Sequence, residues 1–101
     1  MAKREIIWSK VSEEDLKEIL DYYIARNKSI SYSVKLLSLF SDTVKRLSEV
    51  PEIGLRCENS EVRIFILKAY MIIYEYDDNS IQILNVWDSR QNPTKAPFKR
   101  R

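Results

Sequence analysis

The sequence contains no histidine, one cysteine and one glycine among its 101 residues. Without histidine, neither a Ser-His-Asp or Cys-His catalytic group nor a His-ligated metal site can form. A lone Cys57 excludes an internal disulfide and a cysteine-rich zinc site, and a lone Gly54 excludes a glycine-rich phosphate loop. Any acid–base chemistry therefore falls to Asp, Glu, Lys, Tyr or Arg-assisted groups. No metal site and no cofactor is expected.

Long hydrophobic runs are also missing. No apolar run approaches the roughly 18 residues of a membrane span, and the opening Met1–Glu5 has no signal-like character. We therefore expect a cytoplasmic protein without contact to a membrane. With 101 residues, of which 45% are hydrophobic, the chain is long enough for one domain with one core. A single domain over residues 1–101 is predicted.

Positive charge gathers at the carboxyl end of the chain. The net charge is only +2, yet residues 88–101 hold five Lys and Arg residues against the single anion Asp88. We expect this stretch to form a basic C-terminal tail. Such a tail either contacts a polyanion, with Lys95 as a candidate contact, or stays solvated.

Four stretches have the composition of β-strands. Val62–Leu67, Tyr70–Tyr76 and Ile81–Trp87 are rich in Ile, Val, Tyr and Phe, and Glu5–Ser9 is a shorter run of the same kind. The breaks between the last three are too short for a crossover helix, so these three are predicted to form an antiparallel meander.

Two helices are predicted between the first strand and the meander. Ser12 as N-cap with Asp15 three residues later resembles a capping box and starts the first helix. The second is expected from about Tyr32 to Val50, since Pro51 disfavours helical geometry before it. The predicted fold class is α+β with the order β-α-α-β-β-β, a small antiparallel sheet with a two-helix hairpin packed on one face.

The second helix carries two apolar stripes. The main stripe is predicted to face the core and contains Val34, Leu37, Phe40, Val44 and Leu47. A shorter stripe contains Tyr32, Leu36 and Leu39. Two stripes indicate either a helix that is buried on two sides or a helix that offers its second stripe to a partner's helix.

An aromatic row is expected on the middle strand of the meander. Tyr70, Tyr74 and Tyr76 share one face by the alternation of strand side chains. Such a row either stacks nucleobases or packs against the rest of the sheet.

The order of elements and several motifs together resemble the toxins of the RelE/ParE superfamily. The motifs are Ile7-Trp8-Ser9, Pro51-x-x-Gly54, Val62-Arg63, Tyr70-x-Ile72-x-Tyr74 and Ile81-x-Ile83-Leu84-x-Val86-Trp87. The resemblance covers nearly the whole chain. It implies the toxin component of a type II toxin–antitoxin module, neutralised by a cognate antitoxin protein, as a homodimer or a toxin–antitoxin heterotetramer.

The resemblance implies two alternative targets. ParE-like toxins act on DNA gyrase, whereas RelE-like toxins are endonucleases that cut mRNA on the ribosome, here without a metal. This chain lacks the lysine pair and the C-terminal Tyr or His of the RelE-like pattern, which favours a ParE-like toxin. A non-toxic, partner-binding protein of the same fold is the third hypothesis.

The resemblance to the family's motifs implies Arg63 and Arg90 as the candidate catalytic residues. Arg63 matches an arginine within the sheet and Arg90 an arginine after the last strand, and guanidinium groups suit phosphate oxygens. The alternative for Arg63 is an ion pair with Glu61 or Glu75.

Seven further residues are predicted binding contacts. The predicted contacts with the target or with RNA are Arg56, Tyr70, Tyr74 and Lys95. The predicted antitoxin contacts are Tyr32, Leu36 and Leu39.

Overall fold

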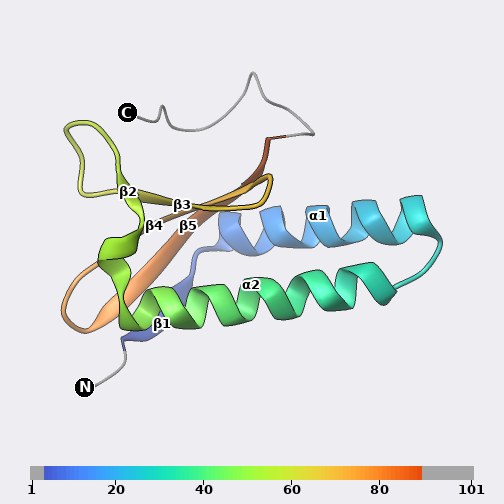
Figure 1. Ribbon diagram of the computed structural model, residues 1–101, viewed down its shortest axis with the longest axis horizontal. Coiled ribbons are helices and arrows are strands. Elements are labelled where there is room, and N and C mark those ends of the chain that lie inside the picture. Colours follow the sequence, from blue (N-terminus) through green and yellow to red (C-terminus); the bar gives the residue numbers. More distant parts are fainter. Residues whose placement is uncertain (1–3, 90–101) are drawn as a thin grey trace.

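The computed structural model describes residues 4–89. Two α-helices, a short 3-10 helix and five strands follow one another along this part of the chain (Figure 1). Their bounds are β1 Glu5–Trp8, α1 Lys10–Asn27, α2 Ser31–Glu49, η1 Pro51–Ile53, β2 Leu55–Arg56, β3 Arg63–Leu67, β4 Tyr70–Tyr76 and β5 Ser80–Asp88. The predicted α+β class is confirmed. No helix among these residues is long and apolar enough to cross a membrane.

The strands form one sheet in the order β1-β5-β4-β3-β2. The predicted meander is confirmed, because β3, β4 and β5 pair antiparallel in sequence order. The expectation of a wholly antiparallel sheet is wrong, since β1 pairs parallel with β5. Two strands joined by a hairpin must pair antiparallel. Because two helices connect β1 to the meander, β1 can pair in either direction. The two-residue β2 adds an edge strand beside β3.

The first helix begins earlier than predicted. Its N-cap is Ser9, whose extended backbone (ψ 160°) follows directly on β1 and whose hydroxyl oxygen accepts a hydrogen bond from the Ser12 N–H at 3.0 Å. Ser12 itself is buried inside the first turn and donates its hydroxyl proton to the Ser9 carbonyl at 2.9 Å. Strand β1 thus passes into α1 almost without a loop, which the prediction from Ser12 missed.

Asp15, the second residue of the predicted capping box, binds strand β5 beside an irregularity in that strand. Ile73 pairs with Asn85 but Tyr74 pairs with Ile83, so Leu84 is an extra residue that forms a β-bulge. The Leu84 carbonyl accepts a hydrogen bond from the Ser9 hydroxyl at 2.9 Å. The Val86 N–H donates to the Asp15 carboxylate at 3.0 Å. Ser9 and Asp15 therefore attach the start of α1 to the bulge.

The two helices run side by side and pack on one face of the sheet (Figure 1). Lys28 ends α1 in the left-handed conformation with φ of 53°. Ser33 near the start of α2 is buried and donates its hydroxyl proton to the Leu20 carbonyl at 2.7 Å. A small polar residue at this position lets the helices approach closely.

The core between helices and sheet shows which side of α2 is buried. The buried α2 residues are Ser33, Leu36, Phe40, Val44, Leu47 and Ser48. The predicted main stripe is therefore right for Phe40, Val44 and Leu47 but wrong for Val34 and Leu37, which are 57% and 44% exposed. The other face of the sheet carries a smaller apolar cluster around Ile64 and Ile73.

Candidate functional site

An apolar groove of about 570 Å³ lies between α1 and α2. Its apolar walls are Leu16, Leu20 and Ile24 of α1 together with Ile30, Val34 and Leu37 near and on α2. Three of these side chains, Ile30, Val34 and Leu37, are strongly exposed, by 63%, 57% and 44%. An exposed groove with these aliphatic walls is the kind of surface that receives an apolar segment of a partner.

Charged residues border the groove on the side of α1. Glu13, Lys17 and Asp21 line it there. The Lys17 ammonium contacts the Asp21 carboxylate at 2.6 Å, and this hydrogen bond raises the pKa of Lys17 above its usual value. An apolar floor with a polar rim is the usual anatomy of a protein–protein interface.

None of the three predicted antitoxin contacts lines this groove. Leu36 is 4% exposed and belongs to the core, so it is not accessible to a partner. Leu39 is partly buried against the same core. Tyr32 is 38% exposed and stacks edge-on with Tyr23, with ring centroids 4.9 Å apart.

The sequence pattern places Val34 and Leu37 on the core stripe, but in the structure both are exposed in the groove. The signal that could have identified them is the position of Ser33 and Ser48. A core stripe drawn through these two serines, Leu36, Phe40, Val44 and Leu47 leaves Val34 and Leu37 on the outer side of the helix.

Arg63, the predicted catalytic residue of the sheet, binds backbone carbonyls. Its Nη1 donates to the Gly54 carbonyl at 2.8 Å and to the Glu52 carbonyl at 3.2 Å. Its guanidinium carbon lies 5.8 Å from the ring centroid of Tyr76. Neither Glu61 nor Glu75 is its partner among these contacts. In this structure Arg63 positions the turn that follows α2.

Tyr74 holds the same turn from the sheet. Its hydroxyl donates to the Pro51 carbonyl at 2.6 Å and accepts the Gly54 N–H at 3.0 Å. The side chain is fully buried, and this burial raises the pKa of Tyr74 to about 12. The hydroxyl therefore stays protonated near neutral pH. Tyr70 is also buried and packs edge-on against Phe40 at 5.2 Å, so neither ring offers a face to a nucleobase.

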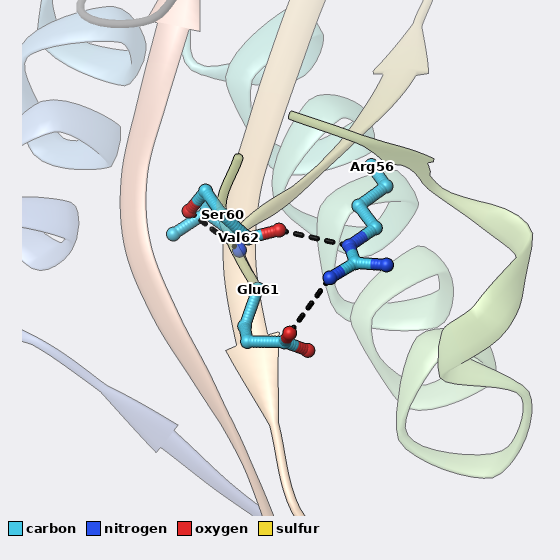
Figure 2. Close-up of polar contacts among 4 residues, drawn as sticks. All are labelled: Arg56, Ser60, Glu61 and Val62. Carbon is cyan, nitrogen blue, oxygen red and sulfur yellow. Dashed lines mark hydrogen bonds and ion pairs between the residues drawn. The ribbon is translucent and has the colours of Figure 1, made fainter. Parts of the chain in front are cut away.

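Arg56 lies directly opposite Arg63 in the pairing of β2 with β3. Figure 2 shows its two contacts, with the Ser60 carbonyl at 2.9 Å and with the Glu61 carboxylate at 2.7 Å. These contacts close the loop between β2 and β3. Because the ion pair is exposed, it adds only about 0 to 1 kcal/mol to stability. A role of Arg56 in target contact stays a prediction.

The structure thus brings Arg56, Arg63 and Tyr74 to the same end of the sheet, where the contacts shown hold the backbone. Arg90 and Lys95 lie outside the described residues. Within residues 4–89, no group of three or more His, Cys, Asp or Glu side chains is arranged to hold a metal ion.

Comparisons with known proteins give the family. The model of the family described as "ParE toxin of type II toxin-antitoxin system, parDE" matches residues 6–93. Among solved structures, one titled "Chromosomal ParDE TA system from P. aeruginosa" has the same fold, with a TM-score of 0.69 and 23% identity, over 83% of this chain and 94% of that one. Among curated proteins none matches. Since the family model spans most of the sequence, the chain belongs to the ParE toxin family of type II toxin–antitoxin systems.

Proposed function

We propose that this toxin inhibits growth by binding DNA gyrase, and that its cognate antitoxin neutralises it by placing an apolar segment in the groove between α1 and α2. Membership of the ParE family supports the target. The observation that carries the choice over mRNA cleavage is the arrangement at Arg63 and Tyr74. Both side chains bind backbone atoms of the turn after α2, and the tyrosine hydroxyl is a poor base.

The gyrase target is tested with purified components. We expect the toxin to reduce the supercoiling of relaxed plasmid by purified gyrase. Because the toxin inhibits by binding, the inhibition should rise with the amount of toxin until all gyrase is bound. Toxin mixed beforehand with an excess of its antitoxin serves as the control and should leave supercoiling intact. Full supercoiling at toxin excess would contradict the proposal.

The competing activities have their own readouts in the same strain. Primer extension on mRNA from cells that express the toxin should show no codon-positioned breaks, and such breaks would support a ribosome-dependent nuclease instead. A non-toxic protein that shares the fold would not arrest growth. Growth arrest on induction, relieved by coexpression of the antitoxin, would therefore support a toxin, whether it inhibits gyrase or cuts mRNA.

The groove is tested by Leu37→Asp. A carboxylate in the apolar groove must be desolvated without a partner, so we expect affinity for the antitoxin to fall by about 100-fold. Val11→Asp is the matched control, since Val11 is 51% exposed on α1 and does not line the groove. Titration calorimetry measures both affinities, and thermal unfolding shows whether each variant is folded. Equal affinities of the two variants would contradict the assignment of the groove.

A further inference from the structure

The groove between the helices adjoins a second pocket of about 400 Å³ between β1 and α2. Trp8 and Ser41 line both, so the two lie side by side. Ile6, Trp8 and Val44 give the second pocket an apolar floor, whereas Arg4 and Lys45 give it positive charge. Among the described residues that line it, none is acidic. The pocket therefore combines apolar surface with two cations.

Strand β1, which forms one wall of this pocket, is an edge strand of the sheet. On its inner side the Glu5 N–H donates to the Asn79 carbonyl and the Ser9 N–H to the Ile83 carbonyl, both at 3.0 Å. Because backbone groups alternate in direction along a strand, the N–H and C=O groups of Ile6 and Trp8 face away from β5. An extended segment of another chain can pair with this edge.

The guanidinium of Arg4 is fixed in place. Its Nε donates to the Asp77 carbonyl at 2.6 Å and its Nη1 to the Ser48 carbonyl at 3.4 Å. Its central carbon lies 5.3 Å from the Tyr76 ring centroid. These two bonds use two of the five N–H donors of an arginine. Lys45 is exposed on α2 at the same pocket. A carboxylate that enters the pocket meets one cation that is held by hydrogen bonds, Arg4, and one that is exposed, Lys45.

We propose that this pocket receives an acidic side chain from an extended segment of the antitoxin, which pairs with the outer edge of β1. This inference rests on the proposed neutralisation by the antitoxin. It extends the antitoxin's contact surface from the groove, past Trp8, into the second pocket. Side chains of the added strand alternate, so one set lies over Ile6 and Trp8. That set contains an Asp or Glu opposite Arg4 and Lys45 and an apolar residue two positions away. The groove supplies apolar contact, and the pocket supplies charge selectivity.

The charge contact is tested with Lys45→Glu in the full-length toxin. We expect affinity for the purified antitoxin to fall by about tenfold, and the loss to shrink as salt is raised. Lys35→Glu is the matched control, because Lys35 is an exposed lysine of the same helix that lines neither pocket. Arg4 is left unchanged because its bonds to Asp77 and Ser48 also support the fold.

Strand pairing is tested by amide hydrogen exchange in the free toxin and in the complex. Exchange at Ile6 and Trp8 should slow by at least about tenfold on antitoxin binding, since these amides gain hydrogen bonds, whereas Glu5 should change little. Unchanged exchange at Ile6 and Trp8 would overturn the pairing.

The outcomes separate this proposal from the proposed function. If Leu37→Asp loses affinity while Lys45→Glu binds as well as Lys35→Glu does, the carboxylate pocket is wrong and the groove stands. If Leu37→Asp binds normally, the antitoxin does not use the groove, and the pocket assignment falls with it.

Discussion

Gly54→Ala is expected to destabilise the fold by about 3 kcal/mol, because the new methyl group has no room. A Cβ on Gly54 would lie 2.2 Å from the Tyr74 hydroxyl and 2.9 Å from two of its ring carbons. The tyrosine is fully buried and cannot turn away. The backbone of Gly54, with φ of −75° and ψ of 156°, suits any residue, so the cost comes from the collision alone. Urea unfolding measures the loss.

The Tyr74→Phe background tests this explanation. Removing the hydroxyl takes away the closest atom, so Gly54→Ala should cost about 1 kcal/mol less there than in the wild type. Tyr74→Phe itself should be destabilising by about 2 kcal/mol, since the buried Gly54 N–H and Pro51 carbonyl lose their partner. If the two substitutions were additive, the collision with the hydroxyl would not be the cause.

Phe40→Ala is expected to cost about 3 to 5 kcal/mol of stability. Phe40 is fully buried between the helices and the sheet, where its ring meets Tyr70 edge-on at 5.2 Å. The cavity left by the ring cannot be filled by the packed strands around it. Thermal unfolding followed by circular dichroism measures the change.

Leu37→Ala is the matched control, three residues away on the same helix. Because Leu37 is 44% exposed in the groove, its truncation should change stability by less than about 1 kcal/mol. A loss as large as that of Phe40→Ala would mean that the outer side of α2 is packed in solution, which would contradict the open groove.

Local patterns in the sequence identified most of the fold. The alternation of apolar residues predicted β3, β4 and β5, and Pro51 marked the end of α2 correctly to within a residue. The parallel pairing of β1 with β5 was not predictable in this way. It depends on where the helix hairpin carries the chain, and no residue within Glu5–Trp8 encodes a direction.

The candidate site was harder to predict, because its contacts join distant segments. For Arg63 the sequence offered carboxylates as partners, but the bonds go to the carbonyls of Glu52 and Gly54, whose nearness results from the turn after α2. Tyr74 shared a strand face with Tyr70, as parity predicted, yet parity does not say which face is covered. Only the packed structure shows that both rings are buried.

The pairing of β1 with β5 also has a consequence for the folding of the toxin during its synthesis on the ribosome. Glu5 is synthesised well before its partner strand, which is complete only at Asp88. Until then β1 has no neighbour, and contacts between residues so far apart in sequence form slowly. We therefore expect the pocket between β1 and α2 to form only after β5 has been synthesised. If the antitoxin binds as proposed, we expect it to recognise the finished toxin and not its growing chain.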